Sequence, residues 1–150
     1  MIKKIIIGLC LMGTFFILSG CGDEHAAPEG STITISGPET ITDGSSSTST
    51  DTAFFTIVVK NRSGVPLDDV EIWITYPWAI PSPANLTQLY DGDTPKDSPM
   101  SVETDENGAF NLRMDYLRGL VDYNGAIQVT SGSVVGTADF AVSSGSGSGA

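Results

Sequence analysis

Apolar and polar side chains alternate in short segments along most of this chain, and this alternation limits what the chain can fold into. In the segment 53–61, Phe55, Ile57 and Val59 fall on one side of an extended backbone, because successive side chains of a strand point to opposite faces. After residue 30, no stretch has the 3.6-residue apolar period of an amphipathic helix. We therefore expect strands over this region.

Turn residues separate the alternating segments, including Gly64 before Pro66 and the pair Asn107 and Gly108, which supplies the positive φ of tight hairpins. Seven or eight short strands in roughly 110 residues predict an all-β fold, an antiparallel sandwich of two sheets over residues 31–142. The other expected strands are 32–36, 70–75, 100–104, 110–114, 127–129 and 138–142. The expected core consists of Phe55, Ile57, Val59, Val70, Ile72, Ile74, Phe110, Leu112, Met114, Ile127, Val129, Ala138, Phe140 and Val142.

The N-terminus has the composition of a secretory signal peptide. Lys3 and Lys4 precede an apolar run of 14 residues, 5–18, which is too short to cross a bilayer as a helix. Small residues follow and stop at Cys21. We expect residues 1–20 to form a signal-peptide helix that is removed on export.

The sequence Leu18-Ser19-Gly20-Cys21 resembles the lipobox of bacterial lipoproteins. The resemblance implies cleavage before Cys21, a diacylglycerol on its thiol and acylation of its new amino group. Gly22 follows the cysteine where inner-membrane retention would use Asp, which by resemblance to Gram-negative lipoprotein sorting favours the outer membrane. In a Gram-positive host the same anchor would place the protein on the outside of the plasma membrane.

The charge of the mature chain excludes several classes of partner. Removal of residues 1–20 takes away two of the seven basic residues and none of the 18 acidic ones, which leaves a net charge of −13. This charge argues against nucleic acid and against electrostatic adhesion to anionic lipids. The two cysteines are Cys10 and Cys21, so the domain is expected to fold without a disulfide. Residues 21–30 are expected to be a lipidated tether, and residues 143–150 a flexible Ser/Gly tail.

Two turn motifs resemble bacterial Ig-like domains of the invasin/intimin type. The first is the run Val58-Val59-Lys60-Asn61-Arg62-Ser63-Gly64-Val65-Pro66-Leu67-Asp68-Asp69-Val70-Glu71-Ile72, and the second is Thr104-Asp105-Glu106-Asn107-Gly108-Ala109-Phe110. The resemblance covers roughly residues 53–142 and implies an Ig-like sandwich, but such motifs specify a fold better than a function. Asp68 and Asp69 stand where the family usually has glycine, and a carboxypeptidase regulatory-like sandwich shares the turn patterns.

The domain lacks the side chains of most catalytic centres. His25 is the only histidine and lies in the expected tether, and residues 30–142 contain neither Cys nor His. Nucleophile systems of the Ser-His-Asp or Cys-His kind and zinc or copper sites are therefore excluded there. Asp91, Asp93 and Asp97 could hold a hard cation such as Ca²⁺, although aspartates are also ordinary turn residues.

The long segment 76–99 is expected to be a loop, and it contains five of the eight prolines. Prolines lower the entropic cost of presenting side chains, and Trp and Tyr are enriched at binding hot spots. We therefore predict a recognition surface formed by Trp73, Tyr76, Trp78 and Tyr90. The alternative is that the loop folds down and its aromatic rings cover a sheet face or edge.

These observations predict a membrane-anchored lipoprotein of the bacterial cell envelope that binds or assembles and does not catalyse. Its expected partner is another envelope protein, an appendage or a glycan. Two alternatives stay open: a purely structural spacer that self-associates, and a Ca²⁺-binding or carboxylate-dependent domain.

Overall fold

A computed structural model describes residues 25–43, 49–75, 87–118 and 122–144 of the chain. The expected signal-peptide helix and the lipidation site Cys21 lie outside the described residues. Within the described ranges the structure contains no helix that could span a bilayer.

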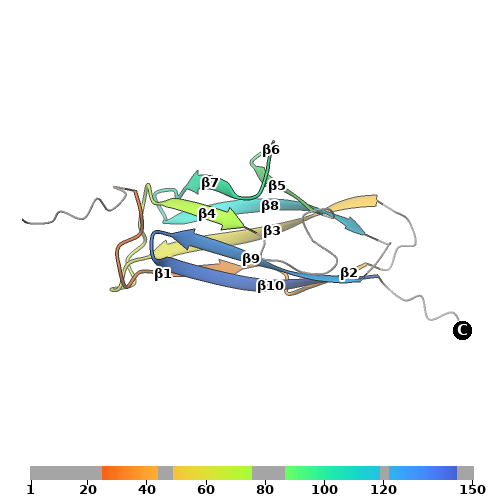
Figure 1. The fold of residues 1–150 in the computed structure, drawn as a ribbon, viewed down its shortest axis with the longest axis horizontal. Coiled ribbons are helices and arrows are strands. Elements are labelled where there is room, and N and C mark those ends of the chain that lie inside the picture. Colours follow the sequence, from red (N-terminus) through yellow and green to blue (C-terminus); the bar gives the residue numbers. More distant parts are fainter. Residues whose placement is uncertain (1–24, 44–48, 76–86, 119–121, 145–150) are drawn as a thin grey trace, which may run out of the picture.

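The described residues form a β-sandwich of two five-stranded sheets (Figure 1). Sheet A has the strand order β1-β3-β8-β5-β6, and sheet B has the order β2-β10-β9-β4-β7. The all-β class and the two-sheet architecture are confirmed, with ten strands in place of seven or eight. The strands are β1 (Thr32–Ser36), β2 (Thr40–Asp43), β3 (Ser49–Lys60), β4 (Glu71–Thr75), β5 (Thr87–Asp91), β6 (Thr94–Lys96), β7 (Met100–Glu103), β8 (Ala109–Arg118), β9 (Tyr123–Ser131) and β10 (Val134–Ser144).

The three strands that the sequence did not predict exist because of their neighbours in the sheets. β2 pairs in parallel with the end of β10, and β5 pairs antiparallel with β8 across residues 87–91. β6 then returns alongside β5 after a turn at Gly92, whose φ is +57°. Each of these stretches is only three to five residues long, so its own residues are too few to specify a strand, and backbone pairing with long strands decides its conformation.

The core lies between the sheets and is built from the side chains that alternation turns inward. Of the fourteen residues expected there, all but Phe110 and Ala138 are buried, and those two are partly buried. The ring of Phe140 packs against Phe55 from the other sheet, with ring centroids 6.2 Å apart, and meets Tyr123 edge-on at 6.5 Å. Burial of these side chains supplies the main free energy of folding, since the described residues contain no disulfide.

The two turn motifs have the same hydrogen-bonding scheme. The side-chain oxygen of Asn61 accepts hydrogen bonds from the backbone N–H groups of Ser63 and Val65, at 2.9 and 3.0 Å. The carboxylate of Asp105 accepts equivalent bonds from Asn107 and Ala109, at 2.8 and 2.9 Å. Each turn then uses a glycine with positive φ, Gly64 at 81° and Gly108 at 65°. The predicted positive φ at Gly108 is confirmed.

Candidate recognition site

The structure separates Trp73 from Tyr90, two of the four aromatic side chains that the sequence grouped into one recognition surface. Trp73 lies on β4 and points outward from sheet B, where 44% of its surface is exposed, as its place in the alternation predicts. Tyr90 lies on β5 and belongs to sheet A, so the two rings are on opposite sides of the sandwich. Tyr76 and Trp78 lie outside the described residues. The segment 76–99 is also not a loop throughout, because it contains the β5–β6 hairpin.

Tyr90 instead lies in a row of large side chains that crosses the outer face of sheet A. Arg113 on β8 stands directly between Phe54 on β3 and Tyr90 on β5, because the strand register pairs it with both. Phe54 is 65% exposed, although it occupies an inner strand of the sheet. The neighbours Phe55, Leu112 and Leu89 point inward and are buried, so alternation forces this row into solvent. We call Phe54, Arg113 and Tyr90 the Arg113 surface.

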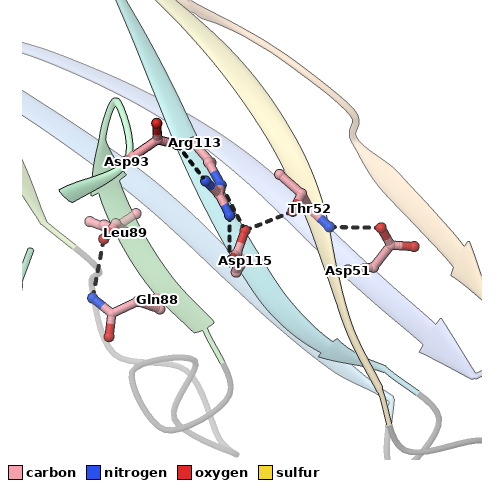
Figure 2. A network of polar contacts seen from close by, with 7 residues as sticks. All are labelled: Asp51, Thr52, Gln88, Leu89, Asp93, Arg113 and Asp115. Carbon is pink, nitrogen blue, oxygen red and sulfur yellow. Dashed lines mark hydrogen bonds and ion pairs between the residues drawn. The ribbon is translucent and has the colours of Figure 1, made fainter. Parts of the chain in front are cut away.

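The guanidinium of Arg113 is held by contacts with Asp115, Asp93 and Tyr90, of which Figure 2 shows the two aspartates. Its Nε and Nη2 donate to the two carboxylate oxygens of Asp115, at 3.1 and 3.0 Å. Its Nη1 donates to Asp93 in the β5–β6 turn, at 3.2 Å. Its carbon Cζ lies 4.4 Å from the ring centre of Tyr90, which is a cation–π contact. The group is therefore fixed in orientation before any partner arrives.

A second set of hydrogen bonds fixes Asp115. The hydroxyl of Thr52 donates to its Oδ1 at 2.7 Å, and the backbone N–H of Thr52 donates to the carboxylate of Asp51 at 2.8 Å. Partial burial by itself would raise the pKa of Asp115, but the hydrogen bonds from Arg113 and Thr52 outweigh it and hold that pKa below its usual range. The hydrogen bond to Asp115 raises the pKa of Arg113. Both groups are charged at neutral pH.

The Arg113 surface is suited to contact with the surface of another molecule. A shallow hollow is lined by Thr52, Phe54, Gly92, Asp93, Asn111 and Arg113. The positive charge of Arg113 lies between the carboxylates of Asp93 and Asp115, so the site does not attract anions. The ring of Phe54 offers an apolar surface to a partner. The side chains Phe54 and Arg113 were absent from the predicted site. The signal that could have found them is the same alternation that turns Phe55 and Leu112 inward.

The structure does not gather the three aspartates of the predicted metal site into one cluster. The carboxylate of Asp91 lies 4.0 Å from the ammonium of Lys96, and that of Asp93 pairs with Arg113. In the part of the chain that the structure describes, no group of three or more His, Cys, Asp or Glu side chains is placed to hold a metal ion.

The described contacts of His25 are with backbone groups of Asp69 and Glu71. His25 is exposed, and its Nδ1 lies 3.4 Å from the backbone carbonyl oxygen of Asp69. The carbonyl oxygen of His25 accepts a hydrogen bond from the N–H of Glu71 at 2.7 Å. The residue thus attaches the N-terminal segment to the start of β4 through its backbone.

Comparison with protein families finds no matching family, and comparison with curated protein sequences finds no match. Among solved structures, a conjugative transposon lipoprotein from Bacteroides eggerthii is 15% identical with a TM-score of 0.47, covering 75% of this chain and 98% of that one. The major subunit of the aggregative adherence fimbriae type I of Escherichia coli is 13% identical with a TM-score of 0.48, covering 80% and 98%. A PapD-like domain of human CEP192 is 10% identical with a TM-score of 0.44, covering 85% and 94%. Similarities of this size do not bear on function.

Proposed function

We propose that this protein is a lipid-anchored, non-catalytic binding module of the bacterial cell envelope, and that it contacts its partner through the Arg113 surface. The anchor follows from the lipobox-like sequence ending at Cys21, and Gly22 favours the outer membrane. The turns at Asn61 and Asp105 support membership of the invasin/intimin type of Ig-like domain, because both use the glycine that this type of motif supplies.

The observation that carries the proposal is the exposure of Phe54 beside an immobilised arginine. Full burial of a phenylalanine side chain stabilises a fold by about 1.5–3 kcal/mol, and Phe54 gains little of this because most of it is exposed. Contact with a partner would explain such a side chain in the middle of a sheet face. Aromatic residues and arginine are enriched at the centres of protein–protein interfaces. A preformed arginine also lowers the entropy lost on binding. A protein partner in the envelope fits these features best.

Site-specific photo-crosslinking in the producing bacterium tests the proposal. A photoreactive amino acid replaces Phe54 in one full-length variant and Val135 in the other, since Val135 is 56% exposed but lies on sheet B. We expect position 54 to give an adduct with a second envelope protein, and Arg113→Gln to reduce that adduct several-fold. Adducts at 135 alone would contradict the Arg113 surface. Adducts only between copies of the chain would favour the structural spacer, and capture of glycan alone would favour a glycan partner.

The anchor is tested separately by metabolic labelling with palmitate. The wild-type chain should carry the label and sediment with membranes, and Cys21→Ser should abolish both. An unlabelled wild-type chain would overturn the lipoprotein assignment and leave the crosslinking result unaffected.

A further inference from the structure

The hydroxyl of Ser131 joins three segments that are far apart in the sequence. It donates a hydrogen bond to the carbonyl oxygen of Glu71 on β4 at 2.6 Å and accepts one from the backbone N–H of Ala27 at 2.8 Å. Ser131 is 1% exposed and lies at the end of β9. The segment before β1 is thus bonded to sheet B by a buried group.

Further contacts hold the same segment along its length. Ala27 is 6% exposed and belongs to the core cluster. A Cβ placed on Gly132 in the β9–β10 turn would lie 3.2 Å from the Cβ of Ala26, so Ala26 leaves little room for a side chain there. The carbonyl oxygen of Pro28 accepts a hydrogen bond from the N–H of Ser31 at 3.1 Å, which turns the chain into β1. We call residues 25–31 the N-terminal clamp; most of these residues were expected to be free tether.

The clamp lies at one end of an elongated body. Figure 1 shows the segment in orange at the left, beside the start of β4 and the turn between β9 and β10. The other end holds the paired residues Ser49 and Arg118, where β3 begins and β8 ends. β3 alone has 12 residues, which span about 40 Å in extended form.

We propose that the N-terminal clamp sets the orientation of the sandwich, so that the end bearing the β9–β10 turn faces the bilayer and the opposite end points away. The inference rests on the proposed lipid anchor at Cys21. From Cys21 to His25 the chain has four residue steps, and whatever their conformation these reach at most about 14 Å. That reach is about a third of the length of β3, so the clamped end must stay near the lipid.

The charge of this end argues that it does not insert into the membrane. Exposed carboxylates occupy its turns, namely Asp68, Asp69, Asp105 and Glu106. Anionic headgroups repel such groups. Arg113 lies midway along β8, so the orientation leaves the Arg113 surface clear of lipid and open to a partner.

Energy transfer from the protein to the bilayer tests the orientation independently of natural lipidation. The processed chain from Cys21 onward is coupled through its only thiol to a maleimide lipid in phosphatidylcholine vesicles that contain an acceptor dye. A donor dye is attached through an azide-bearing amino acid at Ser133, near the clamp, or at Thr50, near the far end; both positions are exposed. We expect transfer from position 133 to exceed transfer from position 50 several-fold. Equal transfer from the two positions would overturn the proposal.

A variant of the clamp supplies the matched control. Ala27→Glu places a charge in a buried position outside every strand and should expel the segment, which lengthens the free chain and brings the ratio of the two transfers toward one. Glu29→Gln, at an exposed position of the same segment, should leave the ratio unchanged. Near-ultraviolet circular dichroism establishes that each variant is folded. An unchanged ratio in folded Ala27→Glu would also contradict the clamp. Failure of palmitate labelling in cells would overturn only the proposed lipidation of Cys21. The orientation would still be tested, because in the vesicle experiment a coupled lipid takes the place of the natural one.

Discussion

Gly136 on β10 lies against the carbonyl oxygen of Ile33 on β1, so closely that a Cβ at position 136 would be 2.7 Å from that oxygen. The two strands belong to different sheets, so this contact closes one side of the sandwich. A backbone atom cannot rotate out of the way as a side chain can, and the position therefore requires glycine.

Gly136→Ala should accordingly destabilise the protein by about 1–3 kcal/mol, because the new methyl group forces the strands apart. Urea denaturation followed by circular dichroism measures the change. Ser133→Ala, at an exposed position of the same hairpin, serves as the control and should be nearly neutral. Equal stability of the two variants would show that β1 and β10 can separate at little cost.

Asp105→Ala should lower the free energy of unfolding by about 1 kcal/mol, because two backbone N–H groups of the turn lose their acceptor. Asp105→Asn keeps an oxygen in the same place and should recover most of the loss. A similar loss in both variants would show that the negative charge, and not the hydrogen-bonding scheme, stabilises the turn.

The phenol of Tyr123 should ionise at a higher pH than an unburied tyrosine. Burial raises its pKa to about 12, and its hydroxyl has no hydrogen-bond partner among the described groups. The unfolded chain loses this proton near pH 10, so stability that is complete below pH 10 should fall as the pH rises toward 12. Ultraviolet titration of the phenolate measures the ionisation. Tyr123→Phe should remove the late step, and a titration without such a step in the wild type would contradict the burial.

Trp73 should emit as a solvent-exposed tryptophan, because nearly half of its surface lies open on sheet B. In the Trp78→Phe variant it is the only tryptophan left, and we expect red-shifted emission that acrylamide quenches readily. Blue-shifted emission that resists quenching would instead mean that another segment covers it.

Calcium should leave the melting temperature unchanged at millimolar concentration, because the carboxylates of Asp91 and Asp93 each face a different cation. Differential scanning fluorimetry with Ca²⁺, and with Mg²⁺ for comparison, measures the effect. A Ca²⁺-specific rise that disappears in the Asp91→Asn, Asp93→Asn double variant would restore the metal hypothesis.

The alternation of side chains was enough to place Phe55, Ile57 and Val59 inward and Trp73 outward, because this property follows from the covalent geometry of an extended chain. The turn chemistry of Gly108 was equally local, since a positive φ depends on the residue itself. Both features could therefore be predicted before any neighbouring strand was known.

Pairing between strands that are distant in the sequence decided which side chains lie next to one another. Only the register of β3, β8 and β5 brings Phe54, Arg113 and Tyr90 into one row, and only the assignment of β4 and β5 to different sheets separates Trp73 from Tyr90. The attachment of Ala27 to Ser131 likewise joins residues 104 positions apart. By itself the sequence determined which way each side chain of a strand points and that the chain forms sheets. The tertiary structure alone decided which strands became neighbours, because register depends on contacts between segments that no local pattern encodes.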